Sequence, residues 1–162
     1  MKKYLALLAL VLPLSVWAQY LLPNEEILYS FETKTGKKMA LVKDKNDGYI
    51  QYRFGNKDHV EMAYPAEKNK DSWKKFKYRS YMRGGGKQNA GMELNYLTFS
   101  NNGYQYQLFR TYYAEDSSYA TGITVTGANG KETNINGIYK SIKGCMCHLQ
   151  ESDLIEKEDT GL

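Results

Sequence analysis

The sequence contains few of the residues that catalysis usually requires. Its 162 residues include only two histidines and two cysteines. The histidines, His59 and His148, are far apart, and no serine stands in the glycine-flanked turn that presents a catalytic nucleophile. Acids such as Glu61 and Glu93 lie in alternating runs, so we expect them on solvated faces and not as a catalytic carboxylate pair. We therefore expect no enzymatic activity and no cofactor.

The two cysteines are too close together to link distant parts of the fold. Cys145 and Cys147 are separated by one residue and, with Met146 and His148, form a group suited in type to copper(I) or zinc. In an extended segment His148 would point away from both thiols, and a structural zinc site needs four ligands. Cys145, Cys147 and His148 are therefore weak metal candidates. The alternatives are a local disulfide, a bond to another chain, and thiols without a role.

Long apolar runs are also missing. The longest, 5–12, is shorter than the roughly 20 residues that a membrane-spanning helix needs. It follows Lys2 and Lys3 and precedes Pro13 and the small-residue site at Ala18, which is the pattern of an export signal peptide. No cysteine follows that site to accept a lipid anchor. The sequence therefore predicts a periplasmic or secreted protein with no membrane span.

Removal of the signal peptide, residues 1–18, would leave one β-rich domain over residues 19–162. This length is enough to bury about two-thirds of the surface of the unfolded chain. The formal charge of +4 includes two lysines of the signal peptide and becomes +2 without them, so the overall charge excludes little. The C-terminal end, 151–162, is acidic and weakly patterned, and we expect a short turn or fraying there.

No segment has the pattern of an amphipathic helix, because apolar residues alternate with a period of two along most of the chain. Turn signals such as Asn46-Asp47-Gly48 and Asn101-Asn102-Gly103 separate alternating runs about ten residues apart. The sequence therefore predicts an all-β fold, an antiparallel meander that forms a small barrel or a sandwich. The expected strands are 27–32, 39–43, 49–54, 59–64, 73–82, 92–99, 104–113 and 119–126, with one or two more within 136–149.

The glycine-rich stretch 84–87 does not fit a phosphate-binding loop. Such a loop would need glycine in place of Tyr81 and a hydroxyl residue in place of Gln88. It should also open a helix, whereas the residues that follow alternate like a strand. We therefore expect no bound nucleotide. The stretch is either a flexible connection between strands or a binding loop with donors such as Arg83 and Lys87.

Positive charge is concentrated between Glu67 and Lys87, where the sequence has eight basic residues and two acidic ones. In a strand over 73–82, three cations would share one face with an aromatic residue at each end. Such a stripe suits an acidic protein, an anionic glycan or a nucleic acid, and the alternative is a solvated strand protected by its lysines against aggregation. The expected partner-binding residues are Trp73, Lys75, Lys77, Arg79, Tyr81, Arg83 and Lys87.

Tyrosine, in contrast, is abundant, with fifteen in the sequence. Most tyrosines are expected within the sheet, because the residue favours strands. An exposed group would suit protein contacts or stacking against sugars. The densest group comprises Tyr96, Tyr104, Tyr106, Tyr112, Tyr113 and Tyr119.

Three runs resemble a family of small exported β-rich bacterial proteins that is uncharacterised: LYSFETKTGKKM (28–39), YIQYRFG (49–55) and RGGGKQNAGMELNYLTF (83–99). A looser similarity, to periplasmic lysozyme-inhibitor-like β-barrels, rests on size, export and an all-β plan, since their serine-glycine-x-x-tyrosine loop is absent.

These features together predict an exported, non-enzymatic binding protein, inhibitor-like or immunity-like. It would dock an exported partner through the basic strand and the glycine-rich loop. The alternative is a glycan-binding module for cell-wall or surface polysaccharide that uses Trp73 and exposed tyrosines. The third and weakest alternative is an enzyme with carboxylate or thiol chemistry.

Overall fold

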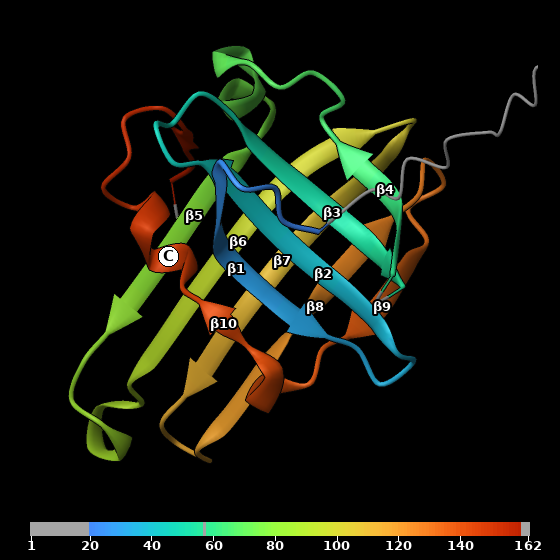
Figure 1. The fold of residues 1–162 in the computed structure, drawn as a ribbon. Coiled ribbons are helices and arrows are strands. Elements are labelled where there is room, and N and C mark those ends of the chain that lie inside the picture. Colours follow the sequence, from blue (N-terminus) through green and yellow to red (C-terminus); the bar gives the residue numbers. More distant parts are fainter. Residues whose placement is uncertain (1–19, 57, 160–162) are drawn as a thin grey trace, which may run out of the picture.

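The structure, a computed structural model, describes residues 20–56 and 58–159, so the expected signal peptide lies outside the described residues. Two β-sheets pack face to face as a sandwich (Figure 1), with strand orders β10-β1-β2-β3-β4 and β11-β5-β6-β7-β8-β9. The predicted all-β, mostly antiparallel fold is confirmed. Of the two architectures that the sequence left open, the structure has the sandwich. Within the described residues, no helix is long and apolar enough to cross a membrane.

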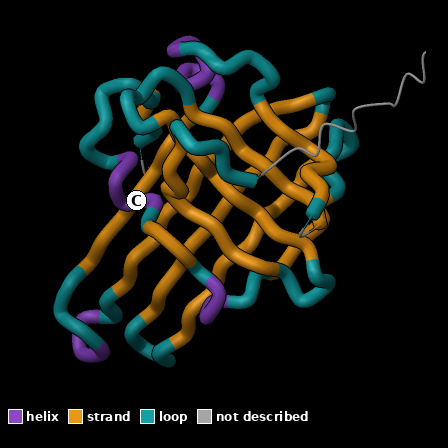
Figure 2. The backbone as a smooth tube through the Cα atoms, in the orientation of Figure 1, coloured by secondary structure: helices purple, strands orange, loops and turns teal. Residues whose placement is uncertain are grey.

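The strands are joined by loops and short 3₁₀ helices (Figure 2). The five-stranded sheet contains β1 (Glu25–Glu32), β2 (Lys37–Asp44), β3 (Ile50–Asn56), β4 (His59–Tyr64) and β10 (Lys143–Gly144). The six-stranded sheet contains β5 (Lys77–Arg83), β6 (Met92–Asn101), β7 (Tyr104–Tyr113), β8 (Ser118–Thr126), β9 (Glu132–Asn136) and β11 (Glu156–Lys157). The 3₁₀ helices are η1 (Lys70–Lys75), η2 (Lys87–Asn89), η3 (Tyr139–Ser141) and η4 (Met146–Leu149).

The core lies between the sheets and follows the period-two alternation of the sequence. Leu97, Leu108 and Ile123 stand side by side on β6, β7 and β8, and all three are fully buried. Tyr29 and Tyr52 of the opposite sheet are also members of this core. Burial of each such side chain contributes about 2 kcal/mol to folding. This packing fixes which side chains of each strand point inward and which point outward.

The turn between β6 and β7 has the conformation that its sequence predicts. Asn101 pairs with Tyr104, so the loop consists of Asn102 and Gly103 alone. Both have positive φ, 50° and 79°, as a two-residue turn of this kind requires. The longest hairpin of the six-stranded sheet therefore has a fixed register.

The predicted strand over residues 73–82 is wrong at its start. Residues 70–75 form η1, whose N-cap Asn69 accepts a hydrogen bond from the backbone N–H of Asp71. Ser72 and Trp73 face the interior from this helix, and the strand begins only at Lys77. The connection between the two sheets needs a compact turn here, because the chain must cross from one sheet to the other.

The acidic C-terminal end is not frayed within the described residues. Glu156 and Lys157 form β11, which pairs in parallel with Lys77 and Tyr78 of β5. Lys77 Nζ lies 3.0 Å from Glu156 Oε1, so the basic strand attracts the acidic tail. This pairing was not predicted, since two residues carry no recognisable strand pattern.

The two sheets differ in length, and the six-stranded sheet projects beyond the other. In Figure 1 the lower ends of β5, β6, β7 and β8 extend past β1 and β10. Met82 and Tyr119 lie on the inner side of this projecting part by register, and they are 78% and 52% exposed. The six-stranded sheet therefore offers two surfaces to solvent, its whole outer face and this uncovered end of its inner face.

Candidate binding surfaces

The outer face of the six-stranded sheet carries four of the seven predicted partner-binding residues. Tyr78 of β5 and Leu97 of β6 are paired and lie in the core. Because side chains alternate along a strand, the odd-numbered residues of β5 point outward. These are Lys77, Arg79, Tyr81 and Arg83.

An aromatic group continues from these residues across the neighbouring strands. Arg79 pairs with Tyr96, which pairs with Phe109, so the three stand in one row on β5, β6 and β7. Cζ of Arg79 lies 4.7 Å from the centroid of the Tyr96 ring, a cation–π contact. Burial raises the pKa of Tyr96, and the neighbouring Tyr113 raises it further. We call Arg79, Tyr81, Tyr96, Phe109 and Tyr113 the outer aromatic face.

The row continues to Gly122 of β8, which has no side chain and therefore keeps the face flat. Phe109 pairs with Gly122, and its ring lies 2.7 Å from the point where a Cβ of that residue would stand. Any larger residue would force the ring away from the sheet. The phenylalanine thus covers the glycine, an arrangement that stabilises glycine within strands.

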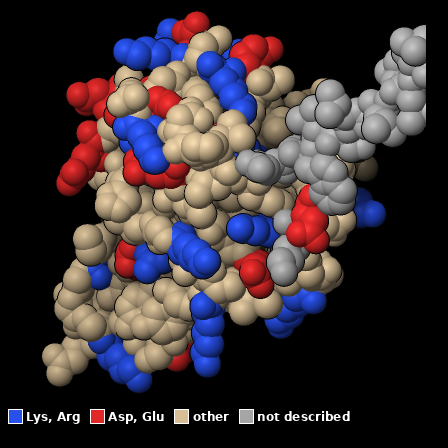
Figure 3. Space-filling view, viewed as in Figure 1, with Lys and Arg blue, Asp and Glu red and all other residues tan. Residues whose placement is uncertain are grey.

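On strands β5 to β8 the charged residues of the outer face are all positive, and the first of them, Lys77, is paired with Glu156 and Glu158 at the edge of the sheet. The outward positions of β6, β7 and β8, all of them described, carry neither acidic nor basic residues. The only charged side chains across β5 to β8 on this face are Lys77, Arg79 and Arg83. By contrast, Figure 3 shows charges of both signs on the side formed by the five-stranded sheet. The outer aromatic face therefore combines aromatic rings with cations alone.

Three predicted partner-binding residues lie elsewhere. The expectation that Trp73 flanks the stripe is wrong, because its side chain is 2% exposed and its Nε1–H donates to the carbonyl of Asp47 at 3.1 Å. Lys75 belongs to η1 and not to the strand, and it lines a hollow of about 360 Å³ with Lys77 and Thr98. Lys87 lies in η2, in the loop after β5.

The glycine-rich loop is closed by hydrogen bonds. The N–H of Gly91 donates to the carbonyl of Gly86 at 2.8 Å, and Arg83 Nη2 donates to the carbonyl of Ala90 at 2.7 Å. Gly85 and Gly86 both have positive φ, which explains why glycine occupies these positions. Both interpretations that the sequence left open, a flexible connection and a binding loop, stay predictions. The loop is a compact turn beside the outer aromatic face.

The second surface is the uncovered inner end of the same sheet, where the rings of three tyrosines lie next to one another. The rings of Tyr112 and Tyr119 are 4.5 Å apart at 27°, and those of Tyr119 and Tyr139 are 4.8 Å apart. We call these three residues the tyrosine ladder. Tyr112 and Tyr119 were in the tyrosine group that the sequence indicated, whereas Tyr139 comes from η3, far along the chain.

A chain of polar contacts runs from the core to the tyrosine ladder. Tyr78 Oη donates to Asn95 Oδ1 at 2.6 Å, and Asn95 Nδ2 donates to Glu93 Oε1 at 3.1 Å. Glu93 forms an ion pair with Arg110, whose Nη2 lies 3.4 Å from Tyr139 Oη. Burial disfavours the charged guanidinium, but Glu93 outweighs this effect and raises the pKa of Arg110. A fixed carboxylate and a fixed guanidinium therefore stand next to the stacked rings.

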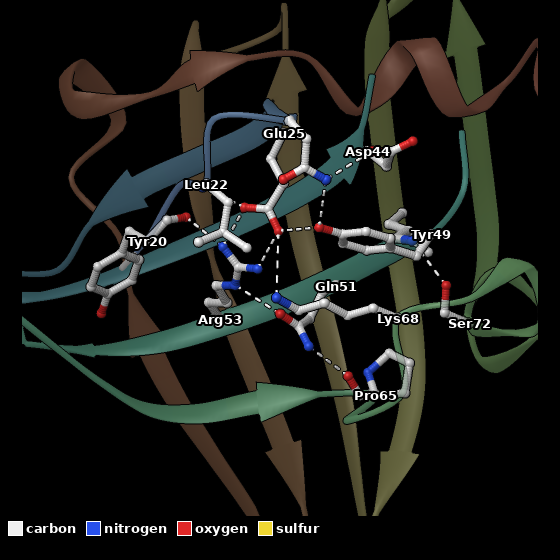
Figure 4. Close-up of polar contacts among 12 residues, drawn as sticks. Tyr20, Leu22, Glu25, Asp44, Tyr49, Gln51, Arg53, Pro65, Lys68 and Ser72 are labelled. Carbon is white, nitrogen blue, oxygen red and sulfur yellow. Dashed lines mark hydrogen bonds and ion pairs between the residues drawn. The ribbon is translucent and has the colours of Figure 1, made fainter. Parts of the chain in front are cut away.

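A buried ion pair lies on the outer side of the five-stranded sheet (Figure 4). It joins a carboxylate and a guanidinium, two groups that active sites often contain. The side chain of Glu25 is fully buried and lies against Arg53. It accepts hydrogen bonds at 2.7 Å from Arg53 Nη1, from Tyr49 Oη and from the N–H of Leu22. Burial raises its pKa, but the hydrogen bonds from Arg53, Tyr49 and Leu22 outweigh burial and lower the pKa of Glu25.

Arg53 connects this pair to two segments of chain that cover it. Its Nη1 donates to the carbonyl of Tyr20 at 2.9 Å, and its Nε donates to Gln51 Oε1 at 2.8 Å. Gln51 in turn donates to the carbonyl of Pro65 at 2.8 Å. The carboxylate and the guanidinium thus bind the N-terminal segment directly, and the guanidinium is connected to the loop after β4 through Gln51. We assign the cluster a structural role.

The cysteines form the local disulfide that was one of the predicted alternatives. Cys145 and Cys147 are bonded to each other, and Met146 between them is fully buried. Closing a loop of only three residues restricts the unfolded chain by roughly 1.6 kcal/mol, about half the effect of a 15-residue loop. Among the described residues, no group of three or more His, Cys, Asp or Glu side chains is placed to hold a metal ion. The disulfide therefore stabilises the fold less than a bond between distant segments would.

Comparison with protein-family models, with curated proteins and with solved structures found no match to this chain.

Proposed function

We propose that this protein is a non-enzymatic binding protein, inhibitor-like or immunity-like, that docks an acidic partner protein on its outer aromatic face. The observation that carries the proposal is the composition of that face. Aromatic rings lie beside arginines, and no acidic side chain stands on β5 to β8 there. Because the sequence predicts a signal peptide, we expect the partner to be an exported protein as well.

The chemistry of the face favours a protein partner. Tyrosine and arginine are the residues most enriched at energetically important positions of protein interfaces. Here Arg79 is held in place over Tyr96, so it loses little side-chain entropy when it meets a carboxylate. An acidic partner would also be attracted over a distance by the cations, which raises the rate of association.

The size of the face indicates a modest interface. Four strands about 4.8 Å apart and seven residues long, with about 3.4 Å per residue, cover roughly 450 Å². Specific interfaces use about 800 Å² from each partner. The compact loop after β5, with Lys87 exposed in η2, lies next to this face and extends it. We therefore place the loop within the interface.

The test uses two variants of the outer aromatic face and one control. Residues 19–162 would capture partners from periplasmic and culture-medium extracts, and the captured protein would then be titrated by calorimetry. We expect Arg79→Glu and Tyr96→Ala each to weaken binding at least about 30-fold, the effect of a residue that contributes 2 kcal/mol or more. Lys131→Glu changes an exposed turn away from this face and should bind like the native protein. Equal affinity of all four proteins would refute the proposal.

A second candidate function, glycan binding, is favoured by the tyrosine ladder. The apolar C–H face of a sugar ring stacks on aromatic side chains, and its hydroxyls bond to fixed charged groups. Glu93 and Arg110 supply such groups beside Tyr119, the most exposed ring of the ladder. This surface lies on the other side of the sheet from the outer aromatic face, so the two candidates involve different residues.

Sedimentation with purified cell wall or surface polysaccharide separates the two candidates. Tyr119→Ala should reduce binding, and the effect should persist at high salt because stacking is not screened. Tyr104→Ala is a matched control, since Tyr104 is 51% exposed and Tyr119 is 52% exposed. If the two variants sediment equally with the polysaccharide, the tyrosine ladder is not a glycan site.

A further inference from the structure

We propose that the Cys145–Cys147 disulfide is a site of thiol–disulfide exchange that oxidises peptide dithiols carrying basic residues. The first observation is access. Cys147 is exposed, as is His148 after it, while Cys145 is half-buried. A thiolate can therefore reach the sulfur of Cys147 from solvent.

The second observation is the anchoring of the segment. Met146 and Leu149 of η4 belong to the hydrophobic core, and both are almost fully buried. These two side chains hold the turn against the sandwich whether or not the sulfurs are bonded. Opening the disulfide would therefore leave the surrounding fold in place.

The third observation gives the reaction a direction. The backbone N–H of Cys147 donates to Sγ of Cys145 at 3.1 Å. A hydrogen bond of this kind stabilises a thiolate more than a neutral thiol, so Cys145 is the better leaving group. Exposure and leaving-group stability thus agree that the attack falls on Cys147.

The reaction needs only the dithiol. A peptide thiolate attacks Sγ of Cys147, a peptide–Cys147 bond forms, the Cys145–Cys147 bond breaks, and Cys145 Sγ leaves with the electron pair and takes a proton from water. The second peptide thiolate then attacks its neighbour in the mixed disulfide and releases the Cys147 thiolate. The peptide is oxidised by two electrons, and the protein disulfide is reduced by two.

The fourth observation is a cavity next to η4, the turn that contains Cys147. It has a volume of about 730 Å³, and His148 and Leu149 of the same turn line it together with Trp73 and Leu154. Lys43 also lies there but is paired with two of the acids. Figure 3 shows acidic side chains gathered where the C-terminal residues lie. The acids that line the cavity are Glu26, Asp47, Glu151 and Asp153.

With four acids and one lysine, the cavity has a net charge of about −3 when His148 is neutral. It therefore attracts basic segments and repels acidic ones. A dithiol peptide with lysine or arginine next to its cysteines would place its positive charges in the cavity while its thiolate meets Cys147. This is the substrate class that we assign to the site.

The test follows reduction of the native disulfide by two synthetic dithiol peptides that differ only in their flanking residues, lysine in one and glutamate in the other. Thiols would be alkylated at intervals and counted by mass spectrometry. We expect the lysine peptide to react about tenfold faster at low ionic strength, with the difference falling as salt is added. Glu151→Gln combined with Asp153→Asn should reduce the preference, and Glu132→Gln, on the distant strand β9, should not.

Two further measurements test the direction of attack and the role of the bond. The native protein would be mixed with an excess of a single-cysteine peptide, the exchange stopped with acid and the mixed disulfide mapped by mass spectrometry, and we expect the peptide on Cys147. Circular dichroism should be unchanged on reduction. The proposal is overturned if the purified protein holds free thiols, if the two dithiol peptides react equally, if the single-cysteine peptide is found mainly on Cys145, or if reduction unfolds the chain.

Discussion

Substitution of Glu25 by glutamine should be one of the most destabilising single changes outside the hydrophobic core. The substitution keeps the shape of the side chain but removes the carboxylate that faces the buried guanidinium of Arg53. Loss of one partner from a buried pair costs about 3–5 kcal/mol. With about 2–4 °C per kcal/mol for a domain of this size, the melting temperature should fall by about 6–20 °C.

The control for this prediction is the adjacent residue. Glu26 pairs with Lys43 at 2.9 Å, but its side chain is 51% exposed, so Glu26→Gln should cost less than about 1 kcal/mol. Thermal and urea unfolding followed by circular dichroism would measure both variants. If Glu25→Gln is no more destabilising than Glu26→Gln, the buried pair does not hold the N-terminal segment as we infer.

The same pair predicts how stability depends on pH. The pKa of Glu25 is lowered in the folded protein relative to the ordinary value of 4.5. Its contribution is therefore complete above about pH 4.5 and is lost as the pH falls through the lowered pKa. The difference in unfolding free energy between the native protein and Glu25→Gln should shrink over that acidic range. A difference that stays constant down to strongly acidic pH would refute the assignment.

Three further changes test the backbone and the core by urea unfolding. Gly103→Ala should reduce the free energy of unfolding by about 1 kcal/mol, because φ is +79° at this position. Gly84→Ala is the control and should be neutral, because Gly84 has no positive φ and an added Cβ is uncrowded at both positions. Gly137→Ala should cost about 1–3 kcal/mol, since its Cβ would stand 2.5 Å from a ring carbon of a buried phenylalanine. Tyr29→Phe should cost about 1 kcal/mol, because Tyr29 Oη lies 2.7 Å from Thr121 Oγ1 in the interior. Costs near zero for Gly137→Ala or Tyr29→Phe would contradict the packing described.

Much of the fold could be predicted because strand alternation and turn residues are local signals. The alternation within 77–81 alone indicates that Lys77 and Arg79 point away from Tyr78. The Asn102-Gly103 pair likewise fixes a hairpin by its own conformational preference. In β6 and β7 the two-residue alternation continues along a long strand, and the predicted bounds of both strands agree closely with the observed ones.

Features that depend on distant contacts could not be predicted. Trp73 has an outward-facing position in any strand that begins there, and only the turn between the sheets places it in the core. Glu25 and Arg53 are 28 residues apart, and nothing local indicates that the N-terminal segment seals them. Tyr139 joins Tyr119 through the packing of η3 against β8, which no pattern in the sequence encodes.

The two shortest strands also determine when folding can be completed. β10 pairs with β1, where Lys143 stands opposite Ser30, and β11 pairs with β5, where Glu156 stands opposite Lys77. One edge of each sheet is thus closed by a strand within residues 143–157, against strands that lie far before them in the sequence. Both edges stay open until this segment docks, and pairings between segments so distant in the sequence form slowly. The docking of this one segment therefore completes both sheets.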